Sequence, residues 1–307
     1  MSRSTVFFVD FEGYFEAVQD LGLTLDDGIK ELMDNACDAG ARRINIIVEQ
    51  IKHPTLLGPK GKPLQGIRLY IVDDGCGIPT SIEDKYGRKY EGLPFAMSFG
   101  GRDDTVRIEG KRRRIGRFGE GLSATLTCLS RERGRAVVFT KQASDEAWRS
   151  CTYEYQDILD HDCKLPEERT DLIPDYEPSR WNAPSGTVIM IDTYEGHRAR
   201  LGSLQNMLMK YTARTYRHLM ADDLRIRVSI EPAGSHRDAR IRDPLCRIEE
   251  SEEVKLFGKA HEFEPIVFTF NGEEDNVVAD YGRIDDDDGN PVEVRIEATW
   301  TDPVKVD

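Results

Sequence analysis

The stretch that decides the expected fold is Glu31-Leu-Met-Asp-Asn35-Ala-Cys-Asp38-Ala39, inside a segment predicted to be helical over residues 25–39. Glu31, Asn35 and Asp38 are four and then three residues apart, so on a helix they share one face. The Cα atoms of Glu31 and Asn35 then lie about 6 Å apart along the axis. A carboxylate there can hold a water while the amide oxygen takes a coordination site on magnesium, which prefers oxygen ligands. Taken alone, the motif is equally compatible with an ordinary amphipathic helix.

A second motif, Asp73-Asp-Gly75-Cys-Gly77, follows an apolar run over residues 67–72 that predicts a buried strand. The glycine-rich turn aims Asp73 at the carboxyl end of that strand. A carboxylate in this place can accept the exocyclic amine of adenine, and glycines let a flat ring approach the backbone. A plain strand-to-turn exit is the competing interpretation.

A third motif, Gly116-Arg-Phe-Gly119-Glu-Gly121, precedes a helix-like run over residues 122–129. Glycine-rich backbone that leads into a helix N-terminus can bind phosphates through its amides. A single glycine motif is weak evidence, because such runs often serve only as turns. The three motifs in this order, each in a fitting local context, predict a magnesium–ATP site with its own hydrolytic base.

On these residues the chain resembles the GHKL-type ATPases, the superfamily of gyrase B, histidine kinases, MutL and the ninety-kilodalton heat-shock chaperone. The resemblance covers roughly residues 10–195. Ser98-Phe-Gly-Gly-Arg102 followed by residues 115–121 is most similar to the MORC-like and chaperone-like branch. The resemblance implies an α+β fold, a two-layer α/β sandwich of the Bergerat type, followed by a β-rich segment.

The resemblance also implies roles for individual residues. Glu31 would be the general base, Asn35 the magnesium ligand and Asp73 the residue that reads adenine. Ser185-Gly-Thr187 opens the next strand, and in such proteins a Gly-Thr pair there places a hydroxyl near adenine. A mobile lid is implied over about residues 98–121. The nucleotide-binding positions are Asn35, Asp38, Asp73, Gly75, Gly77, Ser98, Gly100, Gly101, Gly116, Arg117, Phe118, Gly119, Glu120, Gly121, Leu122 and Thr187.

The expected lid carries the densest basic cluster of an otherwise acidic chain, Arg107, Lys111-Arg-Arg-Arg114 and Arg117. A solvated charged loop is one interpretation of this cluster. A second is that one or two of these side chains contact phosphates when the lid closes, as Lys and Arg do in phosphoryl chemistry. A third is a patch for DNA or an acidic partner. The sequence leaves these open.

Composition is typical of a cytoplasmic enzyme. The 307 residues suggest two domains. No run approaches the roughly 18 apolar residues of a membrane helix, and no signal-peptide pattern is present. Six cysteines occur without Cys-x-x-Cys pairs, so free thiols in a reducing compartment are expected. A net charge of −14 argues against the whole chain being a nucleic-acid binder.

The predicted organisation is an ATP-binding domain over residues 1–222 and the start of a transducer-like domain over 223–307. Residues 53–66 read as a loop or long hairpin connection, residues 159–184 as a long surface insertion, and residues 200–220 as one closing helix. Alternating patterns predict strands at 224–230, 265–270 and 292–298. The acidic run Asp285–Asp288 lacks the spacing of a calcium loop and predicts a solvated hairpin turn.

In related proteins the transducer domain supplies a lysine to the γ-phosphate. Three lysines follow residue 225, Lys255, Lys259 and Lys305, and none sits in a recognisable motif. The chain ends soon after a predicted strand, as expected of a fragment of a longer protein.

Three function classes remain at this point. The first is an ATPase whose cycle drives lid closure and nucleotide-dependent homodimerisation, with ATP and ADP as ligands and a DNA or protein partner at the lid or at a missing C-terminal region. The second is a kinase of the histidine-kinase kind. Such kinases usually carry Asn where this chain has Glu31, and need a phosphoacceptor helix upstream. The third is a non-hydrolysing ATP-gated interaction module, against which an intact Glu31 argues. No membrane partner is expected.

Overall fold

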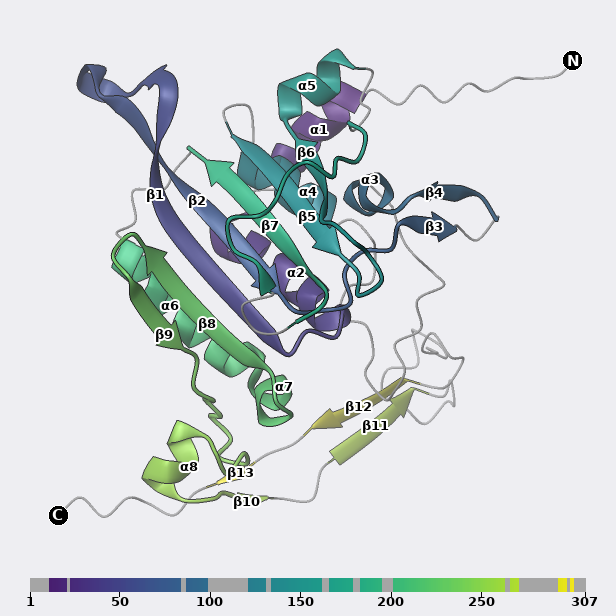
Figure 1. Cartoon of the computed structure of the whole chain (residues 1–307). Coiled ribbons are helices and arrows are strands. Elements are labelled where there is room, and N and C mark those ends of the chain that lie inside the picture. The colour runs from purple at the N-terminus through teal and green to yellow at the C-terminus, as the bar shows by residue number, and fades with distance from the viewer. Residues whose placement is uncertain are drawn as a thin grey trace, which may run out of the picture. The chain divides into compact units, whose positions relative to one another are not determined.

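The computed structural model divides the chain into two compact units, which we describe separately (Figure 1). The first comprises residues 1–212 and 222–239, the second residues 213–221 and 240–307. The structure describes residues 11–20, 23–83, 87–98, 121–130, 134–161, 166–178, 183–194, 201–262, 266–270, 292–296 and 299–300.

The first unit is built on a seven-stranded sheet with the order β6-β5-β7-β2-β1-β8-β9. Neighbouring strands run antiparallel except β1 and β8, which are parallel. The strands are β1 (Arg43–Leu57), β2 (Pro63–Asp73), β5 (Arg135–Lys141), β6 (Arg149–Tyr153), β7 (Gly186–Thr193), β8 (Arg225–Glu231) and β9 (Ser235–Asp238). A separate hairpin pairs β3 (Ser81–Glu83) with β4 (Lys89–Glu91).

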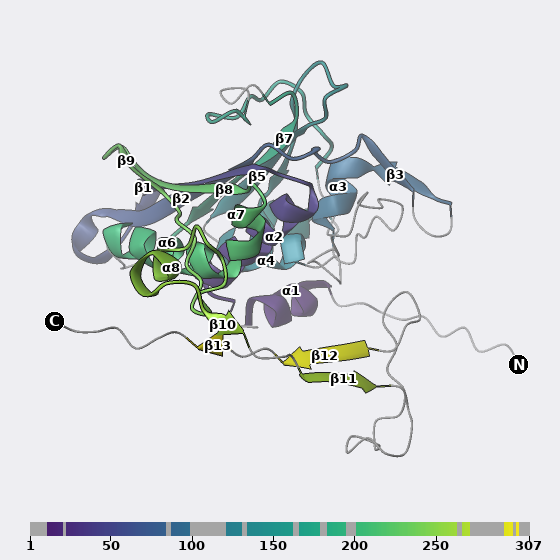
Figure 2. The same ribbon diagram turned by 90° about the horizontal axis from the view of Figure 1, so that it is seen from below.

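Helices cover one face of this sheet (Figure 2). They are α2 (Leu25–Asp38), α4 (Gly121–Ser130) and α6 (Leu201–Thr215), with α1 (Phe11–Asp20), α3 (Gly92–Met97) and α5 (Tyr155–Asp160) completing the unit. Strand residues on that face are buried and apolar, as the side-chain period of two requires; Ile46, Ile71 and Ile189 are examples. The predicted α+β class, with a sheet layer and a helix layer, is confirmed.

The opposite face of the sheet is also covered. Its core cluster consists of Ile47, Tyr70, Val72, Val137, Phe139, Val188 and Met190. Trp148, Leu172 and Tyr176 pack against it. The segment we expected to be a surface insertion over 159–184 therefore contributes part of this cover, because its apolar side chains alternate with the prolines and charges that suggested a loop.

Helix α2 begins where the sequence predicts and for a local reason. Thr24 and Asp27 form a capping box, in which Thr24 Oγ1 accepts from the Asp27 amide at 3.3 Å. The helix ends at Asp38, and Gly40 follows with φ +75, a conformation that glycine adopts without strain. The three polar residues of the first motif thus share a helix as expected.

The loop or long hairpin connection expected at 53–66 is a hairpin, in which β1 continues to Leu57 and pairs with β2 from Pro63. Two other sequence-based expectations differ from the structure. The single helix expected at 200–220 divides at Tyr216 into α6 and α7 (Arg217–Ala221). Strand β8, expected beyond the domain boundary at 222, belongs to the first unit because it lies parallel to β1, and β9, which was not predicted, pairs with it.

The second unit holds α7, α8 (Glu252–Phe257) and two short strand pairs. The pair β11 (Ile266–Phe270) and β12 (Val292–Ile296) confirms two predicted strands, and β10 (His261–Glu262) pairs with β13 (Thr299–Trp300). Buried Asp243 accepts the amides of Leu245, Arg247 and Ile248, which fixes the loop before α8. The acidic run at 285–288 lies outside the described residues. Within them, no helix has the length and apolar character to cross a membrane.

Candidate functional site

Three polar side chains lie in a row at one end of three neighbouring strands. Asp73 on β2 is paired in register with Thr187 on β7, and Thr187 in turn with Thr140 on β5. All three are buried, and the side-chain period places them on the face that the helices cover. Two of the three, Asp73 and Thr187, are residues that the sequence predicts as adenine contacts.

Asp73 is a buried carboxylate that no cation of the described residues pairs with. Burial raises its pKa to about 7, although the backbone amides of Gly75 and Thr187 lower it in part. One carboxylate oxygen accepts from the Gly75 amide at 2.8 Å. Such a group can accept a hydrogen bond from a neutral donor, and an adenine amine is a donor of this kind.

The turn after β2 is tied to the end of helix α2. Asp74 accepts the amides of Arg42 and Arg43, each at 2.7 Å, and the Cys76 amide donates to the Ala39 carbonyl at 2.9 Å. A Cβ at Gly75 would lie 2.8 Å from the Ala39 Cβ. The first and second motifs therefore meet, and only glycine allows so close an approach at residue 75.

Two further glycines permit close approach on the side of β7 and β5. Gly77 has φ +74, and a Cβ there would lie 2.4 Å from the Lys141 carbonyl oxygen. A Cβ at Gly186 would lie 2.2 Å from the Asp73 carbonyl oxygen. Ser185 Oγ donates to the Gly75 carbonyl at 2.8 Å. The Ser185-Gly-Thr187 element is thereby joined to the second motif.

Helices α2 and α4 also meet, and they bring the first and third motifs together. A Cβ at Gly121 would lie 2.5 Å from Glu31 Oε2, so the Glu31 carboxylate lies against the first residue of α4. One turn earlier on α2, a Cβ at Gly28 would lie 2.7 Å from Leu129 Cδ1. Glycine at position 28 lets the two helices pack closely.

Whether a magnesium ion fits beside helix α2 can be judged from the side-chain amide of Asn35. Its nitrogen is buried and has no hydrogen-bond partner among the described residues, and the same is true of the Thr125 hydroxyl on α4. Rotation about the last side-chain bond exchanges the amide nitrogen and oxygen, so the oxygen can take the unpartnered position. An unsatisfied buried amide one helical turn from Glu31 fits an oxygen-seeking cation.

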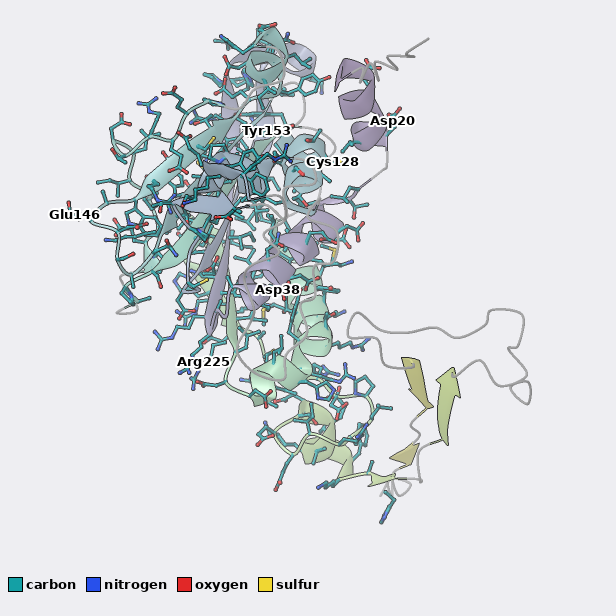
Figure 3. All side chains as sticks on the ribbon, turned by 90° about the vertical axis from the view of Figure 1, so that its right-hand side faces the viewer. Asp20, Asp38, Cys128, Glu146, Tyr153 and Arg225 are labelled. Atoms are coloured by element: carbon teal, nitrogen blue, oxygen red, sulfur yellow. The ribbon has the colours of Figure 1, made fainter. Side chains whose placement is uncertain are left out.

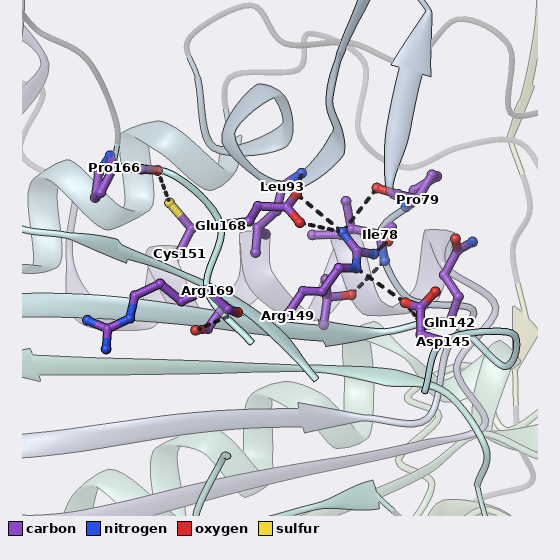
Figure 4. A network of polar contacts seen from close by, with 12 residues as sticks. Ile78, Pro79, Leu93, Gln142, Asp145, Arg149, Cys151, Pro166, Glu168 and Arg169 are labelled. Carbon is purple, nitrogen blue, oxygen red and sulfur yellow. Dashed lines mark hydrogen bonds and ion pairs between the residues drawn. The ribbon is translucent and has the colours of Figure 1, made fainter. Parts of the chain in front are cut away.

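A buried arginine, Arg149, bonds to the chain that follows Gly77 (Figure 4). Arg149 on β6 donates to the carbonyl of Ile78, to Asp145 at 3.2 Å and to Glu168 at 3.1 Å. Glu168 also accepts the amide of Leu93 in the first turn of α3, at 3.0 Å. This network fixes the chain after Gly77 relative to the helix that enters the expected lid.

The structure places the other predicted positions as follows. Asp38 lies half-buried in the last turn of α2 (Figure 3), and Leu122 lies half-buried in the first turn of α4. Ser98 ends α3 and donates to the Phe95 carbonyl at 2.7 Å. Gly100, Gly101, Gly116, Arg117, Phe118, Gly119 and Glu120, with most of the expected lid at 98–121, lie outside the described residues.

Sequence reasoning missed Thr140, Arg149 and Gly28. Thr140 follows an apolar strand run and gives no signal without the register that sets it beside Thr187. Its hydroxyl accepts the Ile78 amide at 2.7 Å. A glycine inside a predicted helix is a signal of close packing, and Gly28 could have been found in that way.

The chain was compared with known proteins. No protein-family model matches the sequence, and no match was found among curated proteins. Among solved structures, the chain is similar to the topoisomerase IV ATP-binding domain of Francisella tularensis in complex with a small-molecule inhibitor. The two share 17% identity with a TM-score of 0.44, over 78% of this chain and 55% of that one. A similarity of this extent does not by itself assign a function, and the chain spans about half of that protein.

Proposed function

We propose that this protein binds ATP with magnesium and hydrolyses it, as a GHKL-type ATPase. One observation carries the proposal: three motifs that are far apart in the sequence converge on one end of the sheet. Gly75 packs on Ala39, and Gly121 packs on Glu31, so the expected adenine, magnesium and phosphate elements become neighbours. A polar helix face, a strand exit or a glycine turn taken separately would not require this convergence.

In this proposal Asp73 reads the adenine. Its free lone pairs accept the exocyclic amine, while the Gly75 amide holds the carboxylate in place at 2.8 Å. Thr187 and Thr140 supply hydroxyls in the same row. Gly77 and Gly186 let the turn after β2 pack closely against the chain at Lys141 and against the start of β7, which holds this row of residues together.

Glu31 acts as general base for the attacking water, and the amides at the start of α4 bind phosphate oxygens. Asn35 and water would hold the magnesium ion, which when bound neutralises charge on the phosphates. Glu31 and Asn35 are one helical turn apart, so a single helix positions the base and the metal ligand together.

We further propose that the ATP cycle acts as a conformational switch of the MORC-like or chaperone-like kind. The glycine-rich segment 98–121 would close over the triphosphate, and closure would support a homodimer that ADP does not support. A cytoplasmic location and a DNA or protein partner belong to this proposal. Slower hydrogen exchange in residues 98–121 with a non-hydrolysable analogue, together with sedimentation, tests the switch; unchanged exchange at saturation contradicts it.

The central experiment is hydrolysis by Glu31→Gln. We expect this variant to retain nucleotide binding and to lose about 10²- to 10⁴-fold in phosphate release, the usual contribution of a positioned general base. Glu83→Gln, an exposed glutamate on β3, is the matched control and should keep wild-type turnover. Near-normal turnover of a clean Glu31→Gln preparation would contradict the assignment of Glu31 as general base.

The same assay separates the competing classes. An ATPase releases phosphate and leaves no label on the protein when γ-labelled ATP is supplied. A kinase of the histidine-kinase kind retains label, and a non-hydrolysing module shows neither. Asn35→Ala should weaken magnesium-dependent binding and hydrolysis together.

A further inference from the structure

A two-stranded ribbon, residues 50–66, extends beyond the rest of the sheet (Figure 1). Pairing of β1 with β8 stops at Glu49, and pairing of β2 with β7 begins at Ile67. Between these points the two strands pair only with each other, from Gln50 opposite Ile67 to Leu57 opposite Pro63. We call this ribbon the basic arm.

The basic arm has a charge opposite to that of the rest of the chain. No Asp or Glu occurs from residue 50 to residue 66, where the charged residues are Lys52, Lys60 and Lys62. The charge of +3 over the arm stands against −17 for all other residues, which together make the net charge of −14. The three arm lysines are exposed, and their ammonium groups make no ion pair or hydrogen bond among the described residues.

Hydrogen bonds within the basic arm and a ring contact at its base restrict its conformation. His53 Nδ1 accepts the amides of Thr55 and Leu56 at 3.2 and 3.0 Å, and the Gly58 amide donates to the Lys62 carbonyl at 2.8 Å. The His53 ring packs edge-on against Tyr194 at 4.8 Å between centroids, which anchors the base of the arm. Ordering of the arm therefore adds little entropy cost when a ligand binds.

Two apolar side chains and a cavity accompany the lysines. Leu56 and Leu57 are 41% and 66% exposed near the tip. A cavity of about 630 Å³ at the base has a mixed lining that includes Lys52, His53, Leu56, Arg68, Arg135, Glu154 and Asp192. From Lys52 to Leu57 the ribbon covers about 17 Å, a length over which duplex DNA presents many phosphates.

We infer that the basic arm is a binding surface for the phosphate backbone of duplex DNA. Unpaired lysines spread along a stiff two-stranded ribbon match a polyanion, and such a ribbon fits the width of the major groove. In the major groove, exposed leucines can make apolar contacts with thymine methyl groups. An anionic membrane fits less well, because the tip that would insert carries Lys60 and Lys62 while the leucines lie behind it. The inference does not rest on ATP hydrolysis.

The test is fluorescence anisotropy of a short mixed-sequence DNA duplex titrated with the full chain over a salt series. Lys60→Gln/Lys62→Gln should weaken binding about tenfold and reduce the slope of log K against log salt by about 2, one per lost phosphate contact. Lys89→Gln/Lys210→Gln removes the same charge from exposed lysines outside the arm and should match the wild type. Because the ammonium groups of Lys60 and Lys62 make no ion pair or hydrogen bond among the described residues, their replacement should leave the unfolding midpoint unchanged.

Equal binding by the two double variants, or no binding of duplex by the wild type, overturns the inference. Arm-dependent binding to phosphatidylserine vesicles without binding to duplex also overturns it and assigns the arm to membranes. Glu31→Gln should bind duplex as the wild type does, so failure of the ATPase proposal and failure of this inference give different results.

Discussion

Two buried aspartates on neighbouring strands have opposite environments. Asp73 and Asp192 are each 4% exposed, at opposite ends of the paired strands β2 and β7 and on opposite faces of the sheet. Asp192 accepts from the guanidinium of Arg68 at 2.6 and 2.9 Å, and Arg135 lies 3.5 Å away. Asp73 has only backbone amides, and burial raises its pKa to about 7.

The difference separates a structural carboxylate from one that is available to a ligand. A buried carboxylate normally has a cation or several donors, because an unpaired charge in the protein interior is costly. Asp192 meets this rule within the fold. Asp73 does not, because its carboxylate is held by backbone amides without a cation among the described residues, which is the pattern expected where a ligand completes the site.

The largest expected difference between the two aspartates is in their effect on nucleotide affinity. Asp73→Asn should weaken ATP binding about 100-fold, because the amide can present a donor toward the adenine amine and leave it unpaired. Asp192→Asn, the matched change at the other end, should leave the affinity within about twofold, since the residue lies five strand positions away, roughly 17 Å. Calorimetry measures both. Equal affinities for Asp73→Asn and the wild type would falsify the adenine-reading role.

The next largest effect is on the free energy of unfolding. Here Asp192→Asn should cause the larger loss and Asp73→Asn the smaller one. Asp192→Asn should lower the free energy of unfolding by about 2 kcal/mol, because Arg68 loses a bidentate partner in a half-buried place. Asp73→Asn should be neutral or stabilising at neutral pH, since it removes a buried charge that has no cation. Urea unfolding followed by circular dichroism compares them. A larger loss in Asp73→Asn contradicts the assigned environments.

The raised pKa of Asp73 also predicts how the stability of the wild type should differ from that of Asp73→Asn as the pH changes. The folded-state pKa of Asp73, about 7, lies above the ordinary 3.8, so the folded state holds this proton more tightly. Its contribution to stability is full below about pH 3.8 and is lost as pH rises to about 7. Between these limits, the unfolding free energy of the wild type should fall relative to Asp73→Asn by about 1 kcal/mol per pH unit. A constant difference across that window would exclude a raised pKa.

The smallest expected effects concern two single hydroxyls, one beside the turn after β2 and one on the opposite face of the sheet. Ser185→Ala removes the 2.8 Å bond to the Gly75 carbonyl and should weaken ATP binding about threefold. Tyr70→Phe removes the 2.8 Å bond to Asp175 on the opposite face and should not change ATP affinity. Equal shifts in both variants would show that the loss reflects stability rather than the site.

The sequence by itself determined much of the local structure. The 25–39 helix, the strand that leads to Asp73 and the helix that follows Gly121 all appear close to their predicted bounds. These elements have strong local causes: a capping box at Thr24, apolar runs of strand length, and glycines at the turns. The residues of the first two motifs could be chosen from the sequence for the same reason.

The tertiary structure alone decided which of these residues meet. Strand register sets Thr140 beside Thr187, and the parallel pairing of β8 with β1 places residues 225–231 in the main sheet. Arg149 gains its importance from contacts with residues 71 and 19 positions away in the chain. No local pattern encodes such pairs, because register and long-range contacts depend on how whole elements pack. Propensity and spacing act within a segment, whereas the environment of Asp73 depends on three strands and two helices together.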